Sequence, residues 1–512
     1  MKNINNKKII GDMHEATAIK TKHPKGLYVL FATEMWERFN FYGMRAILVL
    51  FMTKALLFDK VFASNLYGSY LSLVYLTPLI GGFMADKYWG NNRSIVTGGI
   101  VMAIGELVLF FCGSLYQSSP QLSSVLLFSG LGLMITGNGF FKPNISSLVG
   151  QLYPHGDKRK DAAYTIFYMG INVGGAVGPI LCGLFGDTGN PADFKWAFLI
   201  AGIGMIISVI VQKMFQHKYV RDPENNPLGI VPASAPKKLI SPLVIIAGMF
   251  LLSLICIALF YLDAKYNYLF YLLTACFVGI PTIIFLDKKL SKIEKEKVGV
   301  IFLVCFFVIF FWGAYEQAGA SLTFFAEDQT QRDLGFYTVP ASWFQSFNSI
   351  FIILLAPLFA WFWLKLGKRE PASPFKMALG LFGLALGYLW IAFGVNNVGA
   401  GVKVSMIWLT GMYFLHTSGE LCLSPIGMSL VNQLSPLKYS SLLMAVWFTA
   451  NAFGNKLAGV LSALYPENGK TTSFLGYRMS NLHDFFMLFV FMAGIAAVIL
   501  FLLSSKLKKM MN

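Results

Sequence analysis

Four charged side chains interrupt an apolar stretch near the N-terminus, and their spacing is the most informative chemistry in the sequence. The spacing i, i+3, i+4, i+7, i+11 places one set on a single helical face: Glu34, Glu37, Arg38, Phe41 and Arg45. At a bilayer centre each charge costs about 2.5–3.5 kcal/mol, so four facing lipid would cost roughly 10–14 kcal/mol. About fifteen apolar neighbours offset only about 5–9 kcal/mol of that. The stripe must therefore line a polar cavity with its opposite charges paired, which indicates transport.

A further cation lies in the run from Gly137 to Asn144. The Lys142 ammonium at this depth requires an anion, supplied by protein or substrate. Pro143 frees a backbone carbonyl and is expected to bend the helix toward the cavity. The Gly-x-Gly pattern here does not indicate nucleotide binding, because it lies inside an apolar span and not after a strand.

The later half supplies two more carboxylates, Glu316 and Glu420. Glu420 is a lone carboxylate within its span and is a strong site candidate, whereas Glu316 lies near a helix end, where an interfacial charge is the alternative. His416 is more typical of a packed polar residue than of a proton carrier. Asn172 either lines the cavity or hydrogen-bonds another helix. The remaining polar and aromatic candidates in the spans are Tyr75, Trp312, Asn348, Ser424, Trp447, Asn451 and Asn455.

Three cations and four carboxylates thus fall within the apolar segments of the two halves of the chain. A cavity lined by both signs is bipolar. It suits a zwitterion, with one end held on the Arg and Lys side and the other on a carboxylate in the opposite half.

The elements that must position these residues are membrane-spanning helices. The 512 residues are 56% hydrophobic and 13% charged, with a mean hydropathy of +0.61, against about 25% charged in soluble domains. Apolar segments of about twenty residues recur along the chain, which predicts an all-α polytopic membrane protein with fourteen helices. The predicted spans are 27–53, 62–84, 95–115, 122–150, 161–186, 195–215, 241–262, 267–286, 298–326, 339–364, 375–395, 404–431, 439–464 and 482–504.

The net charge of +16 reflects topology and not nucleic-acid binding. Most of the 41 Lys and Arg fall on the side of the N-terminus, so the positive-inside rule makes that side cytoplasmic. An even number of spans places both termini there, in a multi-pass protein of the inner (cytoplasmic) membrane. We expect no cleavable signal peptide. All six cysteines fall within spans, which predicts reduced packing residues.

Composition divides the chain into an N-terminal tail, two six-helix blocks and a segment between them. The predicted boundaries are 1–26 (tail), 27–215 (first bundle), 216–297 (linker and two extra helices), 298–505 (second bundle) and 506–512 (tail). The extra pair has no polar residue that needs explaining, so we expect it to be peripheral and lipid-facing. A weak repeat relates the two bundles. Pro78-Leu79 in the first bundle and Pro357-Leu358 in the second are each followed by a charged residue, Asp86 and Lys365, eight positions after the proline. Parallel six-helix repeats are typical of the major facilitator fold.

Together these motifs resemble the proton-dependent oligopeptide transporter (POT) family of the major facilitator superfamily, over nearly the whole chain. The matching motifs are Glu34-x-x-Glu37-Arg38-Phe39-x-Phe41-Tyr42-Gly43, Gly81-Gly82-Phe83-x-Ala85-Asp86, Lys142-Pro143-Asn144, Phe167-Tyr168-x-x-Ile171-Asn172-x-Gly174 and Gly419-Glu420-x-x-x-Ser424-Pro425-x-Gly427. The resemblance implies twelve core helices in two six-helix bundles, with two extra helices as in bacterial members. It also implies inward symport of di- and tripeptides with protons by alternating access, in a chain that is not an enzyme.

The resemblance also implies roles for individual residues. Arg45 and Lys142 would hold the peptide carboxylate. The other implied substrate positions are Asn172, Asn348 and Glu420 for the amino group, Tyr42 and Tyr75 for the lining, Ser424 beside Glu420, and Trp312 and Trp447 for the side-chain pockets. The implied coupling and gating positions are Glu34, Glu37, Arg38 and Glu316, with Arg45–Glu316 as an extracellular bridge. We expect no cofactor and no metal, a drive from the proton gradient, and a monomer in the lipid bilayer.

Two positions depart from the family pattern. Phe41 stands where many members have Tyr, which removes a hydroxyl from the site. Gly68 stands where some members carry His, so coupling is not expected to use a histidine there.

Other readings of the same sequence concern the substrate and the class of protein. A carrier of nitrate, of a drug or of another organic ion would share the fold. The Glu34/Glu37 pair and Glu420 favour an amine-bearing ligand instead. An enzyme is disfavoured because no metalloprotease, Ser/His/Asp or nucleotide-loop motif appears. A channel would differ by conducting without saturation.

Overall fold

The computed structural model describes residues 22–154, 156–232, 235–236, 241–396, 398–399, 401–467 and 470–511. Side chains are not described at a few helix and turn positions within those ranges, among them Ser424 and its two successors. The predicted tail 1–26 therefore lies mostly outside the described residues, and so does the predicted substrate contact of Ser424.

The described ranges contain fourteen helices of nineteen or more residues, which is the predicted number of membrane-spanning helices. The first half holds α2 (Lys25–Lys54), α3 (Lys60–Met84), α4 (Asn91–Leu115), α5 (Pro120–Gln151), α6 (Arg159–Gly186) and α7 (Phe194–Tyr219), and the extra pair is α8 (Pro242–Tyr266) and α9 (Tyr268–Leu286). The second half holds α10 (Lys292–Tyr315), α12 (Ser346–Leu366), α13 (Ser373–Gly394), α14 (Met406–Leu434), α15 (Ser440–Ser462) and α16 (Leu482–Met511).

Shorter elements lie between these helices. They are the π-helical turn Ala85–Trp89, the 3₁₀ turns Pro191–Asp193, Glu316–Gly319, Ala341–Gln345, Gly367–Arg369 and Leu437–Tyr439, and α11 (Ser321–Asp328). Strand β1 (Thr330–Gln331) pairs in parallel with β2 (Val404–Ser405), with Thr330 opposite Val404. Strands β3 (Thr472–Phe474) and β4 (Tyr477–Met479) form an antiparallel hairpin. The molecule is therefore all-α apart from these four very short strands in the described residues.

Length and hydropathy explain most of the helices as membrane spans. In the part of the chain that the structure describes, eleven helical segments are long and apolar enough to cross a membrane. The segment α2 is long enough but is not among them, which agrees with the charge that the stripe from Glu34 to Arg45 adds. Only the interior of the protein can accommodate that face, and these charged side chains are indeed buried.

The predicted helix 298–326 is interrupted. The helix α10 ends at Tyr315, a 3₁₀ turn follows over Glu316–Gly319, and α11 begins at Ser321 after Ala320, which has φ −133° and ψ −96°. Gly319 abuts the Tyr67 ring of α3, so that a Cβ there would lie 1.8 Å from the tyrosine oxygen. The break thus brings Glu316 to the boundary between the two halves.

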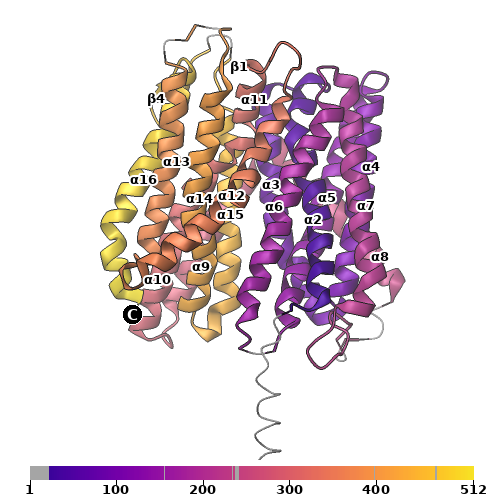
Figure 1. Ribbon diagram of the computed structural model, residues 1–512, viewed down its shortest axis with the longest axis vertical. Coiled ribbons are helices and arrows are strands. Elements are labelled where there is room, and N and C mark those ends of the chain that lie inside the picture. The colour runs from indigo at the N-terminus through magenta and orange to yellow at the C-terminus, as the bar shows by residue number, and fades with distance from the viewer. Residues whose placement is uncertain are drawn as a thin grey trace, which may run out of the picture.

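The two halves lie side by side, and α8 runs along the outside of the first half (Figure 1). We call the face where α2 begins and α16 ends the lower face, and the opposite one the upper face. The helix α8 packs against α5 and α3, while α9 packs against α15. The hairpin α8–α9 therefore contacts both halves.

One expectation about this hairpin is wrong. The helix α8 extends to Tyr266 and includes Asp263, whose side chain is buried and paired with Lys456 of α15. The sequence did not indicate this because Asp263 follows the apolar run that marked the span. The outer faces of both helices nevertheless expose large apolar residues such as Leu243, Phe250 and Tyr271, as a lipid-facing pair would.

Candidate functional site

The charged face of α2 meets α5 in one cluster of two carboxylates and two cations. The Arg38 guanidinium donates to both Glu37 oxygens and lies 3.4 Å from Glu34 Oε1. The Lys142 Nζ donates to the same Glu34 oxygen at 3.0 Å. Asn138 Nδ2 donates to Glu37 Oε1 at 3.2 Å. The charges balance within the cluster, as a membrane interior requires.

Lys142 is the accessible member of this cluster. Its side chain is 32% exposed, whereas that of Glu34 is fully buried. A ligand anion could therefore reach the ammonium without dismantling the rest of the cluster. The anion that the Lys142 ammonium requires is supplied in this structure by Glu34 of α2.

Arg45 bridges the two halves, as the resemblance implied. Its Nη2 lies 3.1 Å from Glu316 Oε2, an ion pair without an aligned hydrogen bond to that oxygen. The Arg45 guanidinium also lies 5.4 Å from the centre of the Tyr42 ring. Tyr75 on α3 is half-buried and within electrostatic range of both Arg45 and Glu316. Glu316 is the first residue of the 3₁₀ turn that follows α10.

The second half presents a polar group built around Glu420 of α14. Tyr315 donates its hydroxyl to Glu420 Oε2, and Asn348 Nδ2 donates to the same oxygen at 3.0 Å. Asn348 also donates to the Tyr315 oxygen and, at 3.2 Å, to Thr417 Oγ1. No cation is among the described partners of this carboxylate, so its hydrogen bonds come from neutral donors.

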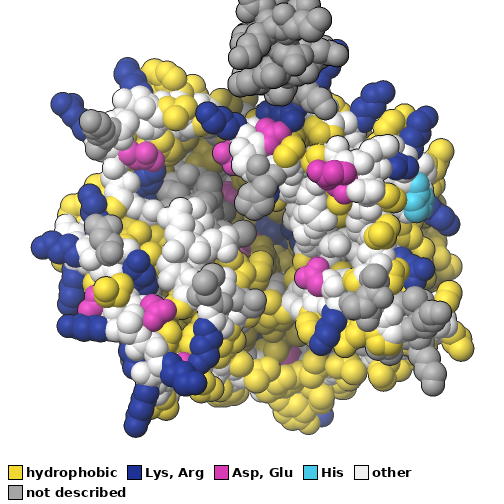
Figure 2. All heavy atoms as spheres, turned by 90° about the horizontal axis from the view of Figure 1, so that it is seen from below, with side chains coloured by type: hydrophobic (Ala, Val, Ile, Leu, Met, Phe, Trp, Pro, Cys, Tyr) yellow, Lys and Arg dark blue, Asp and Glu magenta, His cyan; other side chains and the backbone are white. Residues whose placement is uncertain are grey.

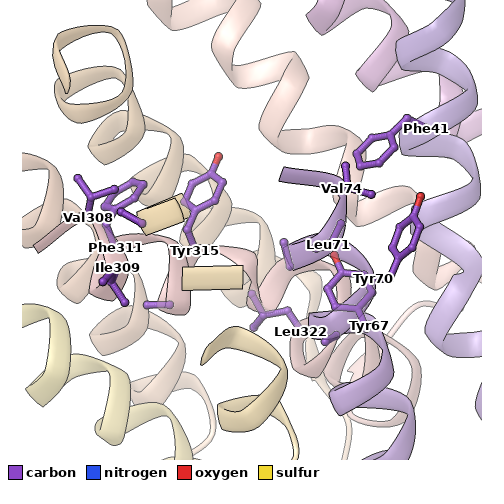
Figure 3. Packing of buried hydrophobic residues seen from close by; sticks show 14 of the residues in the cluster. Phe41, Tyr67, Tyr70, Leu71, Val74, Val308, Ile309, Phe311, Tyr315 and Leu322 are labelled. Carbon is purple, nitrogen blue, oxygen red and sulfur yellow. The ribbon is translucent and has the colours of Figure 1, made fainter. Parts of the chain in front are cut away.

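A small cavity of about 20 Å³ lies between Arg45 and the hydrogen-bond partners of Glu420, and neither Lys142 nor Glu420 is among its lining residues. Its lining includes Tyr42 and Arg45 from the first half and Tyr315, Asn348 and His416 from the second. Hydrophobic residues of the two halves face each other nearby, with Phe41, Tyr67 and Tyr70 on one side and Phe311 and Tyr315 on the other (Figure 3). Phe41 stacks on Tyr70 with ring centres 6.5 Å apart. Phe41, which stands where many family members have a tyrosine, therefore packs against another aromatic ring.

Three predicted site residues make contacts mainly within their own half. Asn172 donates to the backbone oxygen of Tyr168 in its own helix at 2.9 Å and makes no hydrogen bond to another helix among the described residues. Trp447 packs its ring on Gly427 of α14. Trp312 is half-buried, touches Phe311 and Tyr315, and leaves its indole nitrogen without a partner among the described residues.

His416 is packed, as expected. Its ring lies 4.7 Å from that of Tyr388 and against Gly387, where a Cβ would lie 2.3 Å from the imidazole. It nevertheless also reaches the cavity lining.

The upper face is closed by contacts between the halves. Lys54 pairs with Glu327, and Lys60 pairs with Asp328 at 2.7 Å and with Glu467 at 3.0 Å. The remaining contacts are Ser342 N and Oγ to Asp187 at 3.1 Å, Trp343 to the Ile180 oxygen at 2.9 Å, Ser346 to the Ala176 oxygen at 2.8 Å, and Ser64 to Ser462 at 3.1 Å.

The lower face, by contrast, is hollowed between the halves (Figure 2). The structure is therefore closed above the site and open below it. Gly68 contributes to the closure, because its α-carbon approaches Gly459 so closely that a Cβ would lie 2.8 Å away. A histidine could not occupy this position without separating α3 from α15.

Sequence reasoning missed several polar residues of this region. Tyr315 and Thr417 satisfy Glu420 and Asn348, but a tyrosine or threonine inside a span resembles many packing residues. Glu106 of α4 is fully buried and accepts a bond from Asn40 at 2.8 Å, away from the cavity lining. A single glutamate in an otherwise apolar span was the signal that could have identified it.

Neither metals nor disulfides are indicated in the described part of the chain. No group of three or more His, Cys, Asp or Glu there is arranged to hold a metal ion. The six cysteines are free thiols, and five of them are buried.

Comparison with known proteins identifies the class. A family model described as the POT family matches residues 92–475, more than half of the chain. The chain therefore belongs to the POT family of membrane transporters. The predictions of the family and of its all-α major facilitator fold are confirmed, with twelve core helices and two extra ones.

Two relatives illustrate the similarity in sequence. The chain is 34% identical over 465 residues to the peptide transporter YePEPT of Yersinia enterocolitica, covering 86% of this chain and 87% of that protein. It is 32% identical over 462 residues to a di-/tripeptide transporter of Lactococcus lactis subsp. cremoris, covering 86% and 90%.

Solved structures of POT family transporters are similar to this chain in fold. A peptide transporter POT in complex with alafosfalin is 30% identical, with a TM-score of 0.81 over 96% of this chain and 97% of that one. A POT family transporter in complex with 5-aminolevulinic acid is 29% identical, with a TM-score of 0.80 over 95% and 98%.

Proposed function

We propose that this protein is a proton-coupled symporter that imports di- and tripeptides by alternating access. The observation that carries the proposal is that intramembrane cations lie in one half and a carboxylate with neutral donors lies in the other, with Arg45, Tyr315 and Asn348 lining a cavity between them. Arg45 and the Lys142 cluster lie in the first half, and Glu420 with Asn348 lies in the second. A zwitterionic peptide matches both ends, whereas a simple anion such as nitrate would gain nothing from Glu420. The relatives named as peptide transporters support the same substrate class.

The peptide carboxylate would bind Lys142 and Arg45. Both cations are paired in the present state, Lys142 with Glu34 and Arg45 with Glu316. The peptide amino group would bind Glu420, where an ammonium would replace or join the neutral donors Tyr315 and Asn348. An ammonium–carboxylate ion pair is stronger than a hydrogen bond from a neutral donor to the same carboxylate, so the exchange favours ligands with a free amine.

Proton coupling would act through the glutamates paired with these cations. Protonation of Glu316 removes the charge that attracts Arg45 and so weakens a contact that closes the upper face. Protonation within the Glu34/Glu37 pair likewise frees Lys142 or Arg38 for the substrate carboxylate. Each half then exchanges one set of ion pairs for another as the cavity opens to the opposite side.

The same proposal places the protein in the membrane. The lower face would be cytoplasmic, because α2 begins and α16 ends there and the sequence places most of its Lys and Arg on that side. The protein would then be a multi-pass protein of the inner membrane with cytoplasmic termini, acting as a monomer and driven by the proton gradient without a cofactor. The present structure would be the inward-open state.

Uptake into proteoliposomes tests the substrate class. Radiolabelled dialanine should enter with saturation, and unlabelled dialanine and trialanine should compete with it. N-acetyl-dialanine and nitrate should not compete, because each lacks the amine. Competition by nitrate at concentrations similar to those of dialanine, or uptake that does not saturate, would contradict the proposal.

A further inference from the structure

An ion pair outside the substrate cavity joins three elements of the fold. Lys456 Nζ of α15 lies 2.5 Å from Asp263 Oδ2 of α8 and donates to Ser69 Oγ of α3 at 2.8 Å. Both charged side chains are at most 1% exposed. The three partners belong to the second half, the extra hairpin and the first half.

The hairpin that supplies Asp263 contacts both halves. On the α8 side, the Phe260 ring meets Tyr70 of α3 and Phe128 of α5, at 6.5 and 5.3 Å between ring centres. On the α9 side, Phe270 meets Phe453 of α15 at 5.2 Å. The hairpin thus covers the seam between α3 and α15 from outside, with the ion pair beneath it.

Asp263 is also built into the tip of the hairpin. Its Oδ1 accepts the backbone N–H of Leu269 at 2.8 Å, near the start of α9. Its own backbone oxygen accepts the N–H of Asn267, the residue with φ 54° that makes the turn. The carboxylate is therefore held in place before Lys456 pairs with it, which lowers the cost of ordering the pair.

The pair lies in the seam that closes the upper face. Ser64–Ser462, Gly68–Gly459 and Ser69–Lys456 are successive contacts along α3 and α15. When the upper face opens, α15 must leave α3, so Lys456 loses Ser69. The hairpin cannot follow both helices, because α8 packs on the first half and α9 on the second.

We propose that Asp263 is a positioning residue of the transport cycle, which acts through Lys456 to stabilise the state that is closed at the upper face. The extra hairpin then holds the two bundles together at that seam. Opening separates a buried lysine from a carboxylate and a hydroxyl, and breaking a buried pair is costly when one charge keeps no partner. The proposal rests on alternating access as proposed above, but not on the identity of the substrate.

The test measures the opening of the upper face directly. Spin labels on introduced cysteines at Ser118 and Phe336, exposed upper-face positions in the two halves, report the distance between the halves by electron–electron resonance. The native cysteines are replaced by alanine in this background. The variants are Asp263→Asn, whose amide oxygen can still accept from Leu269, and the double variant Asp263→Asn/Lys456→Met, which leaves no unpaired charge.

We expect both variants to raise the ratio of long to short distances by about tenfold or more in the absence of peptide. The double variant should unfold at nearly the same temperature as the parent, so that its shift reflects loss of the contact and not damage to the fold. A matched control is Asp287→Asn, which removes a hairpin contact to Lys438 at the lower face and should not populate the long distance.

An unchanged distance distribution in the folded double variant would overturn the proposal. So would an equal shift in Asp287→Asn, since the effect would then belong to the hairpin in general. If Asp263→Asn unfolds and the double variant stays folded, the distance distribution of the double variant alone tests the proposal. Dialanine uptake by the parent, measured separately, distinguishes failure of this inference from failure of the proposed function.

Discussion

At the scale of residues, the two halves of the protein hold their intramembrane charges in different ways. In the first half, Lys142 is the half-buried cation of a cluster whose carboxylates are fully buried. In the second half, Glu420 is held by neutral donors alone among its described partners. Under the proposed function, the peptide carboxylate would bind the accessible cation and the peptide amino group would bind the carboxylate without a cation.

Removing the carboxylate at the amine end should reduce recognition of the free amine. In Glu420→Gln we expect the affinity for dialanine to fall roughly 10- to 100-fold, because an ammonium–carboxylate ion pair is replaced by an ammonium–amide hydrogen bond. Isothermal titration calorimetry on the purified protein measures the affinity for dialanine. The matched control is Glu106→Gln, a buried glutamate paired with Asn40 outside the cavity lining, which should leave the affinity within about threefold. Equal losses in the two variants would contradict the assigned role of Glu420.

Two other residues test the coupling end of the site. We expect Glu37→Gln and Lys142→Ala to abolish concentrative dialanine uptake under an inward proton gradient, because each leaves the cluster with an unbalanced charge. Counterflow without a gradient, measured on the same vesicles, shows whether binding and exchange survive. Full concentrative uptake by either variant would remove that residue from the mechanism.

At the scale of elements, the sequence predicted the helices better than their junctions. Runs of about twenty apolar residues defined all fourteen helices, since that length is set by the bilayer. The break at Glu316 escaped prediction because Glu316 to Ala318 is compatible with a continuing helix, and only the contact of Gly319 with Tyr67 makes the break understandable.

The pairing of Asp263 with Lys456 escaped prediction for a related reason. The two residues are 193 positions apart, and periodicity within one helix carries no information on which distant helix will face it. The Arg45–Glu316 bridge could be expected only through the family resemblance. The cluster of Glu34 with Arg38 could be expected from i, i+4 spacing alone.

The seam between α3 and α15 allows a direct test of the closed upper face. The hydroxyls of Ser64 and Ser462 are 3.1 Å apart, so Ser64→Cys/Ser462→Cys should form a disulfide on mild oxidation. Because the crosslink prevents the upper face from opening, oxidised protein should lose dialanine uptake and recover it on reduction. Each single cysteine variant is the control and should be unaffected by oxidation. Undiminished uptake by fully crosslinked protein would show that these helices need not separate.

At the scale of the whole molecule, the fold consists of two halves joined across the upper face and hollowed apart below. Charged contacts close the upper face at several depths, from Arg45–Glu316 near the cavity to Lys60–Asp328 at the rim. Proton and peptide would both act on the inner contacts, because those contacts share their residues with the site. Under the proposed function, proton and peptide would therefore be coupled through one set of ion pairs.

The central claim is that peptide and proton enter together, and the pH inside vesicles tests it most directly. Proteoliposomes containing the purified protein and a trapped pH indicator are given external dialanine, with the membrane potential held inside-negative. The account predicts saturable acidification of the lumen that requires dialanine and is absent in Lys142→Ala. Dialanine entry without any acidification would contradict the account.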